Sequence, residues 1–241
     1  MRVLVVTAVP AERDAVLRGA GATATEATEV PVPGGRTAHH AVRPPLTVDA
    51  LAAGVGPAAA AAATAAALTA AELGDAPYGL VVSAGIGGGF APAPLGSVVV
   101  AEAIVAADLG AETPDGFAAV TELGFGTVEH LPEPALVRAV AEATGAVRGA
   151  VLTVSTVTGS AGRAAELLRR HPGAAAEAME GFGVAEAAAA HGVPVLEVRA
   201  VSNAVGPRDR AAWRIGEALD ALAGAFRDLT PALATWKEAS R

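Results

Sequence analysis

The sequence predicts an α/β protein with a mostly parallel, mixed central sheet that helices cover on both sides. Short apolar runs rich in β-branched residues alternate with alanine-rich runs along all 241 residues. The strand-like runs are apolar throughout rather than at every second position, which is typical of a sheet buried on both faces. No linker or repeat interrupts this pattern, so we expect a single domain over residues 1–241.

The predicted elements follow one another along the chain. RVLVV (2–6) predicts a strand and PAERDAVLRG (10–19) a helix, because it begins with proline and ends with glycine. The segment VPVPGGRTAHHAVRPP (30–45) predicts a hairpin or excursion, and LTVDALAAG (46–54) a strand. A helix follows at 56–73, with Pro57 tolerated in its first turn. We then expect strands at 78–85, 96–108, 149–159, 174–180 and 193–203, and helices at 160–170 and 181–192. The closing helix (210–229) should break at Thr230-Pro231.

Composition excludes several classes of protein. A net charge of −8 argues against a general nucleic-acid binder. There is no cysteine, and none of the five histidines has metal-ligand spacing, so we expect no metal and no cofactor. The apolar N-terminal run is short, and Pro10 and charged residues follow it, which makes a poor signal peptide. We therefore expect a cytoplasmic protein with no membrane partner.

Polar residues gather at the carboxyl ends of the predicted strands. They form five clusters, which are Glu12, Ser83 with its glycines, Thr156–Ser160, Met179-Glu180 and Ser202-Asn203. In open α/β sheets, ligands bind outside the carboxyl ends of the strands. The five clusters are therefore expected to converge on one site.

The glycine-rich segments each have two interpretations. GVGPAA (54–59) has spacing that could hold a pyrophosphate, but Pro57 removes an N–H donor and no acidic residue ends a strand about 20 residues later. SAGIGGGFAP (83–92) predicts either a tight turn or a floor of backbone amides beneath a sugar or anion.

The carboxylates and the asparagine are also ambiguous when taken singly. Glu12 and Glu180 each open a helix, where a carboxylate is favoured in any case. Alternatively, a carboxylate at position 180 could accept hydrogen bonds from two neighbouring hydroxyls, such as those of a ribose. Asn203 could form a turn or could face a ligand.

Taken in order, TAVPAE, AAGVG, SAGIGGGFAP, AEAMEGFGVA and VRAVSN resemble the nucleoside phosphorylase/nucleosidase superfamily over almost the whole chain. The methylthioadenosine/S-adenosylhomocysteine nucleosidases are the most similar branch. Within it, VRAVSNAVGPRD is similar to the futalosine hydrolases of the alternative menaquinone route. The resemblance implies a nucleoside phosphorylase-like fold, a small-molecule nucleoside substrate, and a homodimer or larger homo-oligomer.

The resemblance also implies roles for individual residues. Glu12 matches the acid that activates the attacking water, and Asn203 stands where the adenine nucleosidases have an aspartate. The residues implied to bind substrate are Gly87, Gly88, Thr158, Met179, Glu180 and Trp213. Ile86 occupies the region where phosphorylases place phosphate-binding residues, which favours water over phosphate as nucleophile.

The amide at position 203 indicates which purine leaves. A 6-oxopurine offers acceptors at both N7 and O6, and an amide NH₂ can donate to both. We therefore expect hydrolysis of a hypoxanthine nucleoside, futalosine in particular. The alternatives are a methylthioadenosine/S-adenosylhomocysteine-type nucleosidase, a phosphorylase acting on inosine-like nucleosides, and a non-catalytic nucleoside-binding protein. Arg208 or Arg210, close to Trp213 in the sequence, could meet the carboxylate of futalosine's 5′ substituent.

Overall fold

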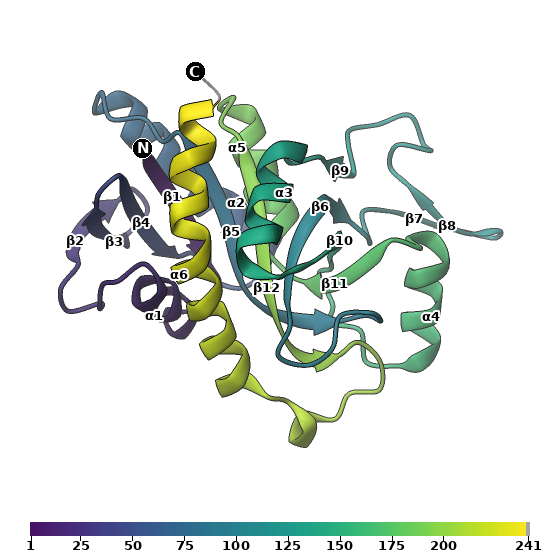
Figure 1. The fold of residues 1–241 in the computed structure, drawn as a ribbon. Helices are drawn as coiled ribbons and strands as arrows, with labels where there is room; N and C mark the ends of the chain where they lie inside the picture. Colours follow the sequence, from purple (N-terminus) through teal and green to yellow (C-terminus); the bar gives the residue numbers. More distant parts are fainter. Residues whose placement is uncertain (240–241) are drawn as a thin grey trace.

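The computed structural model describes residues 1–239, which form a twisted sheet with helices packed against it (Figure 1). The strands are β1 (Arg2–Thr7), β2 (Thr28–Val32), β3 (Arg36–Arg43), β4 (Leu46–Ala52), β5 (Leu80–Gly89), β6 (Val98–Ala106), β7 (Gly110–Thr113), β8 (Gly116–Ala119), β9 (Glu129–His130), β10 (Val147–Thr153), β11 (Ala174–Ala178) and β12 (Val195–Ala204). The α-helices are α1 (Pro10–Gly19), α2 (Pro57–Leu73), α3 (Pro134–Thr144), α4 (Ala161–Arg170), α5 (Gly181–Ala190) and α6 (Ile215–Ala239), and a short 3₁₀ helix spans Arg210–Ala212.

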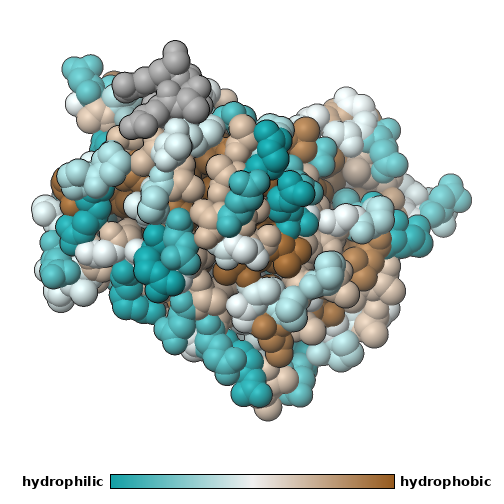
Figure 2. Space-filling view, in the orientation of Figure 1, coloured by the Kyte–Doolittle hydropathy of each residue, from teal (hydrophilic) through white to brown (hydrophobic). Residues whose placement is uncertain are grey.

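Two apolar layers sandwich the central strands. Alternate residues of β1 face opposite ways, so Val3 and Val5 pack with α1, α3 and α6, whereas Leu4 and Val6 pack with α2 and α5. Figure 1 shows α6 crossing one face of the sheet, with α1 and α3 beside it. On that face, hydrophilic residues gather over α1 and the lower half of α6 (Figure 2). The prediction that helices cover both sides is confirmed for this part of the sheet.

The sheet is mixed, as predicted, but it is not mostly parallel and part of it closes on itself, which corrects the predicted layer arrangement. The pairs β1–β4, β1–β5, β5–β12, β6–β10 and β10–β11 are parallel, whereas β2–β3, β3–β4, β5–β11, β6–β12 and β6–β9 are antiparallel. The order β11-β10-β6-β12-β5, together with the β5–β11 pairing, makes a closed barrel. Strands β1 to β4 extend from one side of it.

Glycines in β5 allow this closure. The prediction ended the strand at Gly85, but β5 continues to Gly89 and pairs there with β11. A Cβ at Gly87 would lie 2.7 Å from the Glu177 carbonyl oxygen, and one at Gly88 would lie 2.8 Å from a Val205 methyl group. The run of glycines is therefore an extended strand in close contact with its neighbours, not a tight turn.

Two local predictions differ in outcome. The hairpin expected at 30–45 is confirmed as β2–β3, which turns at Gly34-Gly35. The break expected at Thr230-Pro231 is wrong, because α6 runs through Pro231. Apolar side chains on both sides of the proline, Phe226 and Leu233, remain buried in the core and hold the helix together there. Among the described residues, no helix is both long and apolar enough to cross a membrane.

Candidate active site

A cavity of about 270 Å³ opens where β1, β5, β11 and β12 end, beside the loop after β10. Each of the five predicted polar clusters has a residue in or against it. The predicted site residues on its wall are Glu12, Gly87, Gly88, Met179, Glu180, Asn203 and Trp213, together with Ile86 and Ser202. The structure does not bring Thr158 to the wall, where its neighbour Val157 lies instead.

Glu12 is held by backbone donors on both carboxylate oxygens. Pro10 starts α1 directly after β1, which places Glu12 in the first helical turn. Oε2 accepts from the N–H groups of Ala8 (3.0 Å) and Val9 (3.2 Å), and Oε1 accepts from Ile86 N–H (2.9 Å). Only 4% of the residue is exposed. Burial raises the pKa of the Glu12 carboxyl, while the nearby Arg199 opposes that increase.

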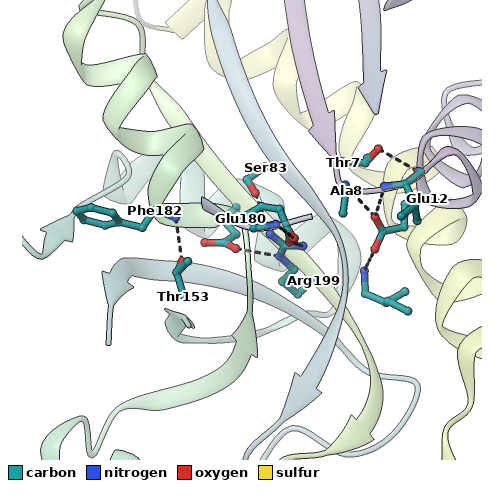
Figure 3. Close-up of polar contacts among 12 residues, drawn as sticks. Thr7, Ala8, Glu12, Ser83, Thr153, Glu180, Phe182 and Arg199 are labelled. Carbon is teal, nitrogen blue, oxygen red and sulfur yellow. Dashed lines mark hydrogen bonds and ion pairs between the residues drawn. The ribbon is translucent and has the colours of Figure 1, made fainter. Parts of the chain in front are cut away.

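Glu180 lies at the junction of β11 and α5 and faces a buried arginine (Figure 3). Its Oε2 lies 3.3 Å from Arg199 Nη1, and its Oε1 accepts from Gly56 N–H at 3.1 Å. The GVGPAA loop thus directs an amide to Glu180. The junction is fixed by Thr153, whose hydroxyl accepts from Phe182 N–H at 2.8 Å.

Arg199 connects Glu180 with other buried polar groups. Its Nε donates to Glu197 Oε1 at 2.9 Å, and its Nη2 donates to Ser83 Oγ at 3.0 Å. Arg199 and Glu197 are fully buried, and Glu197 Oε2 has no hydrogen-bond partner among the described residues. Burial raises the pKa of Glu197, although Arg199 opposes the increase. A Cβ at Gly85 would lie 2.6 Å from Glu12 Oε1 and 2.7 Å from Arg199 Nη1, so glycine is needed where the two side chains approach.

Asn203 is oriented by its neighbours at a bulge in β12. The register between β12 and β5 shifts after Val201, which leaves Ser202 as the extra residue and sets Asn203 beside Gly88. Ser202 Oγ donates to Asn203 Oδ1 at 2.9 Å, and Asn203 Nδ2 donates to the Ala204 carbonyl at 3.0 Å. The second N–H of the amide remains available to a ligand in the cavity.

Glu177 is a third carboxylate on the cavity wall, beside Glu12 and Glu180, and it holds the predicted residue Thr158. Thr158 N–H donates to Glu177 Oε1 at 2.9 Å, and the Thr158 hydroxyl donates to Oε2. Both residues are buried. Through this pair, β11 fixes the loop that carries Val157.

The mouth of the cavity combines an aromatic ring with two cations. Trp213 lines the wall, and the guanidinium carbons of Arg208 and Arg210 lie 5.6 Å and 5.9 Å from the centroid of its ring. This combination suits an aromatic or anionic group at the entrance.

Sequence reasoning did not identify Glu177, Glu197 or Arg199 as site residues. Each lies inside an apolar strand, where a single charge does not reveal which way its side chain points. The available signal was that charged residues are almost never fully buried unless they are paired. Glu197 and Arg199, two apart in one strand, share a face and could have been recognised as such a pair.

Comparison with known proteins identifies the family. Residues 2–234 match the model of the phosphorylase superfamily. The chain is 69% identical over its full length to the whole of a futalosine hydrolase from Streptomyces coelicolor. The chain belongs to the futalosine hydrolase family. It is also 47% identical to a futalosine hydrolase from Acidothermus cellulolyticus, over 94% of this chain and 89% of the relative.

The solved structures support the same fold. A futalosine hydrolase mutant from Helicobacter pylori strain 26695 superposes with a TM-score of 0.80, over 96% of this chain and 99% of the other. The two sequences are only 18% identical, so this similarity concerns the fold alone.

Proposed function

We propose that this chain hydrolyses the N-glycosidic bond of futalosine and releases hypoxanthine and dehypoxanthinylfutalosine, a step of menaquinone biosynthesis. The observation that carries the proposal is one cavity lined by Glu12, Glu180 and Asn203, in a chain of the futalosine hydrolase family. Each residue matches a separate chemical need of the reaction, namely activation of water, alignment of the sugar and interaction with the leaving base.

Glu12 acts as the general base. Its two oxygens are fixed by three backbone N–H groups, so the carboxylate has one orientation toward the cavity. A water molecule bound there attacks C1′ and transfers a proton to Glu12 while the C1′–N9 bond breaks. The base departs as an anion and takes up a proton from solvent, and Glu12 returns its proton to solvent. A pKa above that of an ordinary glutamate suits a group that must accept a proton near neutral pH.

Glu180 binds the ribose. Arg199 and Gly56 N–H take up part of its hydrogen-bonding capacity and hold the carboxylate in place. The remaining lone pairs accept from the 2′- and 3′-hydroxyls, which aligns C1′ with the water. Met179 and the glycines of β5 form the surrounding wall.

Asn203 interacts with the departing base. The bond from Ser202 to Oδ1 directs the amide nitrogen away from Ser202, and the one N–H that is not bonded to the Ala204 carbonyl faces the side of hypoxanthine that carries N7 and O6, where both acceptors can share it. An amide stabilises the leaving group by hydrogen bonding and does not protonate it. The 6-oxo group of hypoxanthine helps, because it spreads the negative charge that develops on the base.

The entrance accommodates the 5′ substituent of futalosine, which carries an aromatic carboxylate. Trp213 contacts the aromatic ring, and Arg208 and Arg210 attract the carboxylate.

The test is to incubate the protein with futalosine, inosine and methylthioadenosine, with and without phosphate, and to identify the released base and sugar. Futalosine should release hypoxanthine at a rate that does not depend on phosphate, and addition of a chelator should have no effect. Release of adenine from methylthioadenosine in preference would instead indicate an adenine nucleosidase. A sugar 1-phosphate product would indicate a phosphorylase.

We also propose that residues 1–241 act as a single domain in a cytoplasmic homodimer or larger homo-oligomer. Exposed apolar side chains between residues 109 and 131, which are Leu109, Leu123, Phe125 and Leu131, offer a surface for association. Sedimentation equilibrium should give a mass of at least twice 23.5 kDa. A monomer at micromolar concentration would contradict this assembly.

A further inference from the structure

Glu177 is a buried carboxylate held by hydrogen bonds from Thr158, and none of the salt bridges among the described side chains involves it. It lies on β11, is 5% exposed and lines the cavity. Glu180 and Glu197 pair with Arg199, but Glu177 forms no salt bridge within residues 1–239. Its oxygens accept only from the N–H and hydroxyl of Thr158.

A role in folding alone does not explain this carboxylate. Removing an ionised carboxylate from water is costly unless charge or several hydrogen bonds compensate. Holding the buried Thr158 requires hydrogen-bonding groups but no charge, because a glutamine amide at this position could accept from the Thr158 N–H and donate to its hydroxyl. A carboxylate kept on the wall of a binding cavity indicates a donor on the ligand.

The sheet register places this acceptor opposite Asn203. Gly88 of β5 pairs with Glu177 on one side and with Asn203 on the other. Adjacent strands lie about 4.8 Å apart, so the two residues are separated by roughly two strand spacings. A purine ring between them can present N7 to Asn203 and N1 to Glu177, because these two atoms lie on adjacent edges of the base, on either side of the 6-oxo group.

We propose that Glu177 accepts a hydrogen bond from N1–H of the 6-oxopurine and, with Asn203, determines which purine is bound. The inference rests on the proposed function, because it assigns a second contact to the same leaving base. Hypoxanthine has a hydrogen on N1, whereas N1 of adenine carries a lone pair that would face the carboxylate. Glu177 thus reads the N1 edge of the base, and Asn203 reads N7 and O6.

Thr158 gives Glu177 its orientation. With one donor on each oxygen, the carboxylate is fixed and still has a free lone pair on each oxygen for the base. The prediction that Thr158 contributes to base recognition is therefore retained in an indirect form, through Glu177.

The experiment measures binding of free bases by calorimetry, which does not depend on turnover. Hypoxanthine, its 1-deaza analogue and adenine are titrated into the wild type, Glu177→Gln and Thr158→Val. The 1-deaza analogue replaces N1–H with a C–H of similar size. Glu186→Gln is the matched control, because Glu186 pairs with His130 outside the cavity. Thermal unfolding of each variant verifies that it is folded.

A hydrogen bond to a charged group typically changes affinity by roughly 10- to 150-fold. The wild type should bind hypoxanthine more tightly than the 1-deaza analogue by a factor in this range, and Glu177→Gln should lose most of that preference. Thr158→Val should retain most of it, and Glu186→Gln should retain all of it.

Three results would overturn the inference. They are equal binding of the two bases by the wild type, an unchanged preference in Glu177→Gln, and complete loss of preference in Thr158→Val. The last result would mean that Glu177 only holds the loop. If Glu177→Gln does not fold, the wild-type affinities for hypoxanthine and its 1-deaza analogue still test whether N1–H is recognised. Failure of the wild type to release hypoxanthine from futalosine would refute the proposed function itself, and the two failures are therefore distinguishable.

Discussion

Glu12→Gln replaces one oxygen of a carboxylate that accepts its described hydrogen bonds from backbone N–H groups. Oε2 accepts two N–H bonds, from Ala8 and Val9, and Oε1 accepts one, from Ile86. An amide has a single oxygen. The glutamine should therefore turn its oxygen toward the two donors and its NH₂ group toward Ile86 N–H, so that one buried donor loses its acceptor.

Two magnitudes follow from this arrangement. An unsatisfied buried donor costs about 1–3 kcal/mol, which is a fraction of the ~5–15 kcal/mol that stabilises a typical domain. The variant should therefore fold, with a lower unfolding temperature. Loss of a general base should lower kcat by ~10²–10⁴-fold, because an amide cannot accept the proton from water.

The assay is hypoxanthine release from futalosine under saturating substrate, combined with thermal unfolding of the same sample. Asp14→Asn, on the same helix but 41% exposed at its side chain, is the control and should change neither quantity appreciably. A fall in kcat of less than about tenfold, well below the range for a lost general base, would refute the assignment and leave Glu12 as a structural cap of α1.

Three further predictions concern the base, pH and the buried charges. Asn203→Asp should lower kcat/KM for the 6-oxo nucleoside relative to its 6-amino form by roughly 5- to 150-fold, and a ratio that changes by less than about twofold would mean that Asn203 does not contact the base. Because burial raises the pKa of Glu12 above 4.5, kcat/KM should decline on acidification at a pH above that value, and a profile that is flat down to pH 4.5 would contradict a base at this position. Glu197→Gln should retain activity, whereas Glu197→Leu should lose it, since only the amide can still accept from Arg199 Nε. Because the pKa of Glu197 is raised in the folded protein, its own contribution to stability is fully present below the ordinary value of 4.5 and is lost as pH rises through the folded pKa. Over that range the free energy of unfolding should therefore fall less for Glu197→Gln than for the wild type, which denaturation at a series of pH values would show.

The parts of the site that the sequence predicts are those fixed by local rules. Pro10 marks the first turn of a helix, which places Glu12 at the end of β1. Glu180 lies directly after a short apolar strand and directly before a helix. Since the carboxyl ends of parallel strands share one edge of a sheet, both carboxylates could be assigned to one site before the structure was known.

The parts that the sequence does not predict depend on contacts between distant strands. Closure of the barrel requires Gly88 and Gly89 to pair with β11, nearly 90 residues later, and no local pattern encodes that pairing. The bulge at Ser202 likewise depends on the β5 register. Without these contacts, Glu177 is a single charge in an apolar run, and its side chain cannot be placed.

The buried charges around Arg199 give a physical reason for one otherwise unremarked glycine. Arg199 pairs with Glu197 and Glu180 and interacts electrostatically with Glu12, so three carboxyl groups surround one guanidinium. Burial raises the pKa of Glu197, which favours its neutral form. Glu197 accepts from Arg199 Nε and thereby orients the guanidinium, whose Nη1 faces Glu180.

In the proposed reaction, positive charge develops on the ribose as the C1′–N9 bond breaks, and the carboxylates of Glu12 and Glu180 stabilise it. Arg199 holds Glu180 in place, and Glu197 orients Arg199. Glu197 lies against the start of α5, where a Cβ at Gly181 would overlap its carboxyl group. Glycine is therefore needed directly after Glu180, because a side chain there would prevent Glu197 of β12 from reaching Arg199. The adjacent residues 180 and 181 thus supply both the proposed ribose-binding carboxylate and the room for the side chains that hold it.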